Sequence, residues 1–391
     1  MSTGSRKGFR ESCDELHEMA IRETGLSDFG AADYLPNLER LLESYDREAI
    51  LSEEGALATR RLLQTCLEGR LYSTHRLSLH PECLERPVER PLVIAGFPRT
   101  GSTALHKLLA ADPSTQALEY FLACRPDVRP PRGEWSSHPS YRATVAELDR
   151  IYEGSPEMRV AHSMRAGEAD ECRLLFMHDF LSVSFSFNAT IPSYERWLFD
   201  QDMRTAYAHY RDNLKLIGAA ETEKRWVLKN SSHLWALPAL EVTFPDVCLV
   251  RTHRNPLEWL VSIASLVHKS RLIYEPDVRK EDVGAQALRQ WSQVAKLCLE
   301  DREKLSCDLL DVHYLHFVKD PLASVRRIYD HFDWSWTSQT EASIREWAEQ
   351  NQQHQHGVHR YSAEEYGLSE AMIAEELADY IEWEQAILNE I

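Results

Sequence analysis

The sequence lacks any long uninterrupted hydrophobic run. Its longest apolar stretches, residues 91–97 and 260–267, are much shorter than the roughly eighteen residues that a membrane-spanning helix needs. Residues 1–15 alternate charged and polar side chains and contain no apolar core of the kind that a signal peptide requires. We therefore expect neither a transmembrane segment nor secretion.

Positive charge is also scarce. The 391 residues include 44 lysines and arginines against 62 aspartates and glutamates, which gives a formal net charge of −18. Affinity for nucleic acids and other polyanions depends on basic side chains that neutralise phosphate or sulfate groups. We therefore expect no nucleic-acid partner, although a local basic pocket is compatible with this charge.

Paired cysteines are missing as well. The eight cysteines form no C-x-x-C pair and are spread through a long chain, an arrangement that favours reduced thiols over a disulfide framework. A chain of this length buries a sizeable core without covalent cross-links. Together with the absence of a signal peptide, this predicts a cytoplasmic location.

The most informative absence is a single lysine. Residues 96–103, Gly-Phe-Pro-Arg-Thr-Gly-Ser-Thr, have the spacing of a phosphate-binding P-loop, but Ser102 stands where a nucleotide triphosphatase has lysine. Such a loop offers backbone N–H groups and a helix N-terminus to an anion, whereas the lysine reaches the β- and γ-phosphates. The pattern predicts phosphate binding without triphosphate chemistry. An ordinary strand-to-helix turn with two glycines is the alternative.

Three short apolar runs, residues 91–95, 225–229 and 247–251, each suit a buried parallel strand. A helical pattern follows the first run, and residues 234–244 suit a helix that returns the chain between the other two. We therefore predict an α/β fold, P-loop-like and three-layered, with a mostly parallel central sheet. Ligands bind beyond the carboxyl ends of such strands, so side chains that follow the three runs should converge on one crevice.

Helical periodicity dominates the N-terminal part of the chain. Apolar residues at helical spacing predict helices from about residue 33 to about residue 80. We assign residues 1–88 to a helical N-terminal extension and residues 89–391 to the α/β domain. Residues 125–133, which are rich in proline and arginine, predict an exposed loop.

A second group of basic residues follows the third strand candidate. Asn255 is a favourable N-cap and Pro256 fits the first position of a helix, so a helix is expected to begin here. Arg254 precedes this helix and Ser262 lies on its second turn. A guanidinium, a hydroxyl and the helix dipole would together hold a phosphate. The alternative is that these are ordinary basic residues at a helix entrance.

Taken together, the loop at residues 96–103 and the Arg254-Asn-Pro sequence with Ser262 resemble the paired signature of PAPS-dependent sulfotransferases, in particular of bacterial members. The resemblance implies that 3′-phosphoadenosine 5′-phosphosulfate (PAPS) is the donor, with its 3′-phosphate held by Arg254 and Ser262. The residues implied to bind its 5′-phosphosulfate are Arg99, Thr100, Gly101, Ser102 and Thr103.

The resemblance extends to a C-terminal segment of bacterial relatives, which implies that His359, Arg360 and Tyr361 contact the 3′-phosphate or the adenosine. A metal site is the competing interpretation of His354, His356 and His359. No carboxylate or cysteine has the matching spacing, and sulfuryl transfer demands no metal. We therefore predict that the protein requires no metal ion.

Sulfuryl transfer needs a cation near the leaving oxygen and a base for the acceptor's proton. Arg99 lies in the loop, and Lys229 matches a lysine of the family, so we predict that both are catalytic. A histidine often follows that lysine in the family and acts as base in the cytosolic enzymes. The spacing here is four residues rather than two, but an imidazole has a suitable pKa, so His233 is the predicted base.

The alternative base is a carboxylate from Glu168 or Glu171. Both lie in residues 164–172, the acidic segment, where bacterial relatives often carry an acidic motif. A purely structural role is equally compatible with the sequence: these acids would then only pair with Arg165 or Arg173 on a helix face.

The leading hypothesis is an enzyme that transfers a sulfuryl group from PAPS to a hydroxyl, or less readily an amine, of a small, apolar or lipid-like acceptor. The acidic charge and the aromatic residues of segment 176–199 favour that acceptor, although most of these aromatics should be core. A P-loop kinase or nucleotide triphosphatase is the alternative enzyme, and it predicts lysine at position 102. A non-catalytic nucleotide-binding protein would bind the donor product and form no sulfated compound.

Overall fold

The computed structural model describes residues 8–154, 164–351 and 362–389. Its centre is a five-stranded sheet in the order β2-β3-β1-β4-β5, in which every neighbouring pair is parallel. The strands are β1 (Leu92–Gly96), β2 (Thr115–Gln116), β3 (Arg225–Lys229), β4 (Cys248–His253) and β5 (Asp308–His313). The predicted α/β fold with a parallel central sheet is confirmed.

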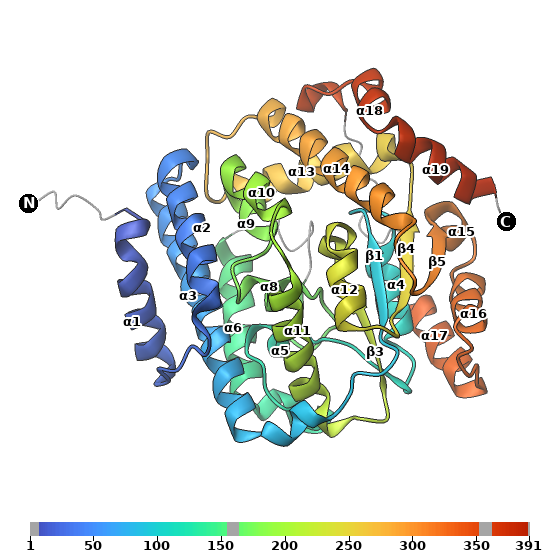
Figure 1. The fold of residues 1–391 in the computed structure, drawn as a ribbon, viewed down its shortest axis with the longest axis horizontal. Helices are drawn as coiled ribbons and strands as arrows, with labels where there is room; N and C mark the ends of the chain where they lie inside the picture. The colour runs from blue at the N-terminus through green and yellow to red at the C-terminus, as the bar shows by residue number, and fades with distance from the viewer. Residues whose placement is uncertain (1–7, 155–163, 352–361, 390–391) are drawn as a thin grey trace, which may run out of the picture.

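Alternating side chains of β1 build the two helical layers. Leu92 and Ile94 join an apolar cluster with helices α4 (Ser102–Leu109), α16 (Pro321–His331) and α17 (Ser338–Gln350). Val93 and Ala95 point the other way, into a cluster with α12 (Leu237–Thr243), α13 (Pro256–Arg271) and α14 (Lys280–Arg302). Successive side chains of a strand point to opposite faces, so a strand buried on both faces reads as one continuous apolar run. Figure 1 shows α12 and α14 over one face of the sheet.

The register of the strands brings their carboxyl ends to one edge. Gly96 lies beside Thr252, and Ile94 lies between Lys229 on one side and Val250 on the other. His253 pairs with His313 at the end of β5. Residues that follow β1, β3, β4 and β5 therefore meet at this edge.

Three N-terminal helices, α1 (Cys13–Thr24), α2 (Leu35–Glu48) and α3 (Glu53–Leu79), lie side by side in Figure 1. Helices α2 and α3 match the predicted helical region, with a break at residues 49–52. Their buried side chains belong to the same cluster as Val93 and Ala95 of the sheet. The boundary between residues 88 and 89 stays a prediction.

Shorter helices fill the space between α3 and the sheet. They are α5 (Tyr120–Cys124), α6 (Pro139–Gly154), α8 (Arg173–Met177), α9 (Ser184–Asn188), α10 (Pro192–Phe199) and α11 (Arg204–Ile217). From segment 176–199, Phe176, Phe180, Phe185 and Tyr194 are fully buried in the core. At the other end of the chain lie α15 (Tyr314–Lys319), α18 (Glu370–Glu376) and α19 (Ala378–Asn389).

The prediction of an exposed loop at residues 125–133 is only partly correct. Residues 125–131 form no helix or strand and residues 131–133 are exposed, but Arg125, Asp127 and Arg129 are buried. Arg129 Nε lies 3.0 Å from Glu119 Oε2, and its Nη1 lies 2.8 Å from Glu221 Oε2. Two carboxylates thus neutralise a guanidinium that has left solvent, which is the condition for burying such a charge. A composition rich in arginine gives no sign of these distant partners.

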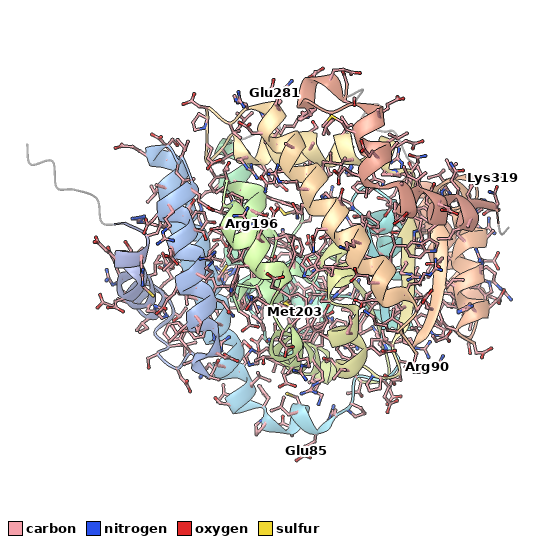
Figure 2. All side chains as sticks on the ribbon, turned by 45° about the horizontal axis from the view of Figure 1, so that its top comes forward. Glu85, Arg90, Arg196, Met203, Glu281 and Lys319 are labelled. Atoms are coloured by element: carbon pink, nitrogen blue, oxygen red, sulfur yellow. The ribbon has the colours of Figure 1, made fainter. Side chains whose placement is uncertain are left out.

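Charged side chains cover the surface, as the exposed residues Glu85, Glu281 and Lys319 show in Figure 2. All eight cysteines are free thiols. Within the described ranges, no helix has both the length and the apolar character required to cross a membrane.

Candidate active site

The loop between β1 and α4 has two residues in the left-handed backbone region. Gly101 has φ +84°, and Arg99 has φ +66°, which is unusual for a side chain with a Cβ atom. A Cβ added to Gly101 would lie 3.1 Å from the rings of Tyr314 and Phe317. Glycine is therefore required at this position. The backbone strain at Arg99 is of the kind that clusters at ligand sites.

Buried hydroxyls fix the same loop from below. The Thr100 hydroxyl donates to the Phe97 carbonyl at 2.7 Å and lies 2.6 Å from the Thr252 hydroxyl. The Ser102 side chain is also buried, whereas Thr103 is exposed. Thr100 and Ser102 can therefore offer a ligand their backbone N–H groups, while Thr103 also presents its side chain.

The structure brings the second group of basic residues against this loop. Arg254 Nη1 donates to the Arg99 carbonyl at 2.9 Å, and Arg99 Nε donates to the Ser262 hydroxyl at 3.2 Å. Asn255 caps α13 as predicted, because its side chain accepts a hydrogen bond from the Leu257 N–H at 3.0 Å. Arg99, Arg254 and Ser262 thus form one hydrogen-bonded unit at the carboxyl ends of β1 and β4.

An aromatic residue that the sequence did not indicate completes this unit. The Arg254 guanidinium lies 4.2 Å from the ring centroid of Tyr314, the first residue of α15, directly after β5. A cation over an aromatic face is attracted by the ring quadrupole. The sequence pattern predicts no strand at residues 308–313, so it does not indicate that Tyr314 lies at the site.

Lys229 ends β3 and is buried beside the loop. Its Nζ donates to the Thr103 hydroxyl at 3.2 Å and forms an ion pair with the Glu171 carboxylate. The Cys172 N–H donates to the Lys229 carbonyl at 3.0 Å, so the acidic segment crosses the end of the strand. A cation and a carboxylate therefore lie together at the mouth of the loop.

Glu168 is positioned differently. Its carboxylate lies 2.6 Å from Lys107 Nζ and 3.2 Å from Arg165 Nη1. Glu168 therefore forms the ion pair with Arg165 that a purely structural role predicts. Glu171, in contrast, pairs with Lys229.

His233 lies in the core rather than in the crevice. Its ring packs among Phe176, Tyr207 and Tyr210, and its Nδ1 lies 2.6 Å from the Tyr207 hydroxyl. Burial lowers the pKa of His233 to about 3. Among the described residues its Nε2 has no hydrogen-bond partner. The imidazole is therefore neutral at neutral pH and is a weak proton acceptor, so its placement favours Glu171 as the base.

A buried charge network stabilises the ends of β4 and β5 behind the site. Asp311 accepts hydrogen bonds from Arg251 Nε at 2.8 Å and from His253 Nε2 at 2.9 Å. Burial opposes ionisation of Asp311, but His253 and Arg251 outweigh it and hold the pKa of this carboxyl well below its usual range. The strand that delivers Arg254 is thus tied to its neighbour.

One side-chain group among the described residues has the composition of a metal site. Ligand atoms of Asp33, Asp179 and His209 lie within 4.8 Å of one another. Arg70 already pairs with Asp179 and lies 3.0 Å from Asp33 Oδ1. A guanidinium therefore neutralises this group, and we assign it no ion. The predicted ligand residues His359, Arg360 and Tyr361, together with His354 and His356, lie outside the described residues.

Comparisons with known proteins agree on one family. The family model described as "Sulfotransferase family" matches residues 91–338. The crystal structure of sulfotransferase STF1 from Mycobacterium tuberculosis H37Rv superimposes on this chain with a TM-score of 0.87. The two sequences are 36% identical, and the match covers 95% of this chain and 100% of that chain. The crystal structure of sulfotransferase STF9 from Mycobacterium avium is 25% identical, with a TM-score of 0.87 and 98% of each chain covered. Among curated protein sequences, none matches significantly.

Proposed function

Because the chain belongs to the sulfotransferase family, we propose that it is a PAPS-dependent enzyme that transfers a sulfuryl group to a hydroxyl of a small acceptor. The observation that carries the proposal is the unit formed by Arg99, Arg254 and Ser262 at the ends of β1 and β4, with Lys229 beside the same loop.

The residues fit the two anionic ends of PAPS. The loop before α4 supplies backbone N–H groups, the exposed Thr103 hydroxyl and Arg99 for the 5′-phosphosulfate. Arg254 and Ser262 lie at the start of α13, where a guanidinium, a hydroxyl and the helix dipole favour the 3′-phosphate. These cations gather at one edge of the sheet in a protein whose formal net charge is −18.

Bound PAPS supplies the sulfuryl group, and the protein's residues hold the charges and the proton. We assign Lys229 to the negative charge that develops on the leaving phosphate oxygen, because its ammonium contacts Thr103 of the loop. We assign Glu171 as the base that accepts the proton of the acceptor hydroxyl, because its carboxylate contacts Lys229 and so reaches the same place. The neutral, buried His233 would then have a packing role among Phe176, Tyr207 and Tyr210.

The alternative functions are less well supported. A P-loop kinase or nucleotide triphosphatase needs a lysine where this chain has the buried Ser102. A non-catalytic nucleotide-binding protein has no need for a carboxylate paired with Lys229 at the mouth of the loop. The cytoplasmic location stays a prediction.

The direct test uses PAPS labelled with ³⁵S and a panel of hydroxyl compounds. We expect the wild-type protein to transfer label, and Lys229→Met to lower kcat by about 10²- to 10³-fold because charge on the leaving oxygen is no longer stabilised. Lys319→Met is the matched control, since Lys319 is exposed on the outer surface (Figure 2). Tight binding of adenosine 3′,5′-bisphosphate without any label transfer would support the non-catalytic alternative.

A further inference from the structure

Among the described residues, Arg173, which directly follows the acidic segment, forms no ion pair. It begins α8, two residues after Glu171, and its side chain is half-buried. Its Nη1 lies 3.8 Å from Met177 Sδ and its Nη2 lies 3.9 Å from Met164 Sδ. Within the described ranges, no carboxylate lies within ion-pairing distance of it. Thioether sulfur is a weak acceptor, so most of its five N–H donors have no strong partner among the described residues.

The other basic residues around the acidic segment are paired. Arg165 and Lys107 both contact Glu168, and Lys229 contacts Glu171. Asp170 and Glu171 are close enough to Arg173 to raise its pKa against the opposing effect of burial, yet neither touches it. Its positive charge is therefore stabilised, while its two terminal nitrogens contact only thioether sulfur among the described residues. A guanidinium removed from water in this way normally meets an oxyanion.

The surroundings of Arg173 come from several parts of the chain. Tyr120 of α5, Met164 and Tyr274 are, like Arg173 itself, half-buried and keep accessible surface. Burial raises the pKa of the phenols of Tyr120 and Tyr274, and the Arg173 guanidinium opposes this rise in both. The Arg173 guanidinium thus contacts two thioether groups, lies near enough to two phenols to affect their ionisation, and follows Glu171 by two residues in the chain. This combination suits an acceptor with an apolar body and one anionic group.

We propose that Arg173 binds an oxyanion of the acceptor, a carboxylate or a phosphate, while the acceptor's hydroxyl lies at Glu171 and Lys229. This assignment rests on the proposed sulfotransferase function and narrows its acceptor to an anionic hydroxyl compound. A planar guanidinium binds either oxyanion through two parallel hydrogen bonds, which also fixes the acceptor's orientation. Arg173 would act on acceptor choice and leave donor binding unchanged.

The test compares matched acceptors that differ only in whether their acidic group is anionic or esterified and neutral. ω-Hydroxydodecanoate is compared with its methyl ester, and dodecanediol monophosphate with its dimethyl ester. Affinity is measured by calorimetry on protein saturated with adenosine 3′,5′-bisphosphate, and kcat/KM is measured with labelled PAPS. We expect the wild-type protein to prefer the anion of at least one pair by about 10- to 100-fold, as a charge-assisted hydrogen bond predicts. The pair with the larger preference identifies the oxyanion.

Variants assign the preference to this residue. Arg173→Gln should abolish it, Arg173→Lys should retain part of it, and Arg165→Gln should leave it unchanged, because Arg165 is exposed and paired with Glu168. Thermal unfolding midpoints check that the variants fold, and Arg173→Lys keeps the test valid if Arg173→Gln does not.

Two outcomes separate this inference from the proposed function. Suppose that the wild-type protein binds adenosine 3′,5′-bisphosphate but prefers neither anionic acceptor over its neutral ester, or binds none of these acceptors. The role of Arg173 is then overturned, and the proposed sulfotransferase function stands. An anion preference that survives in Arg173→Gln overturns it as well. If adenosine 3′,5′-bisphosphate itself fails to bind, the proposed function is what fails.

Discussion

Arg254 is held in one orientation by three different contacts. Its guanidinium donates to the Arg99 carbonyl and to Glu258 Oε2 at 2.8 Å, and it lies over the ring of Tyr314. A side chain fixed in this way loses little rotamer entropy on binding an anion. The ion pair with Glu258 balances the positive charge of Arg254.

Substitution of Arg254 should weaken binding of one phosphate specifically. We expect Arg254→Gln to raise the dissociation constant of adenosine 3′,5′-bisphosphate by about 10- to 100-fold, because a charge-assisted contact is lost. The affinity for adenosine 5′-phosphosulfate, which has no 3′-phosphate, should change by less than about threefold. Calorimetry with the two nucleotides measures both values. Equal losses for both would place Arg254 elsewhere on the donor.

The base is the second question at the residue scale. We expect Glu171→Gln to lower kcat by about 10²- to 10⁴-fold, as removal of a general base does, with donor affinity largely kept. His233→Gln should change kcat by less than about tenfold, because the ring is buried and its pKa is near 3. Steady-state rates of the two variants settle the assignment. A large loss in His233→Gln alone, with Glu171→Gln still active, would return the role to His233.

The proximity of four residues could be predicted from the sequence, whereas their roles stay predictions. Arg99, Lys229, Arg254 and Ser262 each lie at or after the end of a strand candidate or in the helix that follows it, and parallel strands bring such positions together. The burial of His233 was not predictable, since it depends on Tyr207 and Tyr210 of α11, far from it in sequence. The pairing of Glu171 with Lys229 was one of several partners that the sequence allowed.

At the scale of elements, the strand–loop–helix unit of β1 and α4 depends on glycine. Gly101→Ala would force an alanine to φ +84° and place its Cβ 3.1 Å from two aromatic rings. We expect a loss of stability of about 1–3 kcal/mol and a weaker affinity for adenosine 3′,5′-bisphosphate, because the loop is displaced. Denaturant unfolding and calorimetry measure the two effects.

Gly133→Ala is the control for this substitution. An added Cβ at Gly133 meets no atom within 4 Å, and its backbone is not in the left-handed region. Unfolding free energy and nucleotide affinity should both stay near the wild-type values in this variant. A Gly101→Ala protein as stable and as tightly binding as Gly133→Ala would contradict the role given to the loop.

Elements also show why some strands were predicted and others were not. Strands β1, β3 and β4 were found because each contains an uninterrupted apolar run buried on both faces. Strand β5 was missed because Asp308, Asp311 and His313 interrupt its apolar residues, and β2 has only two residues. The charges of β5 are satisfied by Arg251, His253 and Glu384. Those partners become visible only once the strands are paired.

At the scale of the whole molecule, buried histidines make stability depend on pH. Burial lowers the pKa of His106 to about 4 and that of His178 and of His233 to about 3. An unfolded histidine titrates near pH 6.5, so between these values the unfolded chain binds more protons than the folded one. The stability contributed by each neutral ring is therefore present above pH 6.5 and is lost as the pH falls below it.

The difference between wild type and His178→Gln isolates this effect. Burial raises the pKa of Glu68, Glu119 and Glu195, and these groups act in the opposite direction in both proteins. Between pH 7 and pH 5 the wild type should lose about 2 kcal/mol of unfolding free energy relative to the variant. Denaturant titrations at the two pH values measure it. A difference that does not change with pH would show that His178 is already protonated in the folded protein or exposed to solvent.

The central claim is that this P-loop-like site is built for a nucleotide with separate 5′ and 3′ phosphates. Calorimetry of the wild-type protein with adenosine 3′,5′-bisphosphate, compared with ATP and magnesium, tests it most directly. Because Ser102 replaces the triphosphate lysine and we propose Arg254 and Ser262 as a second anion site, we predict tighter binding of adenosine 3′,5′-bisphosphate by at least about tenfold. Tighter binding of ATP with magnesium would contradict the account.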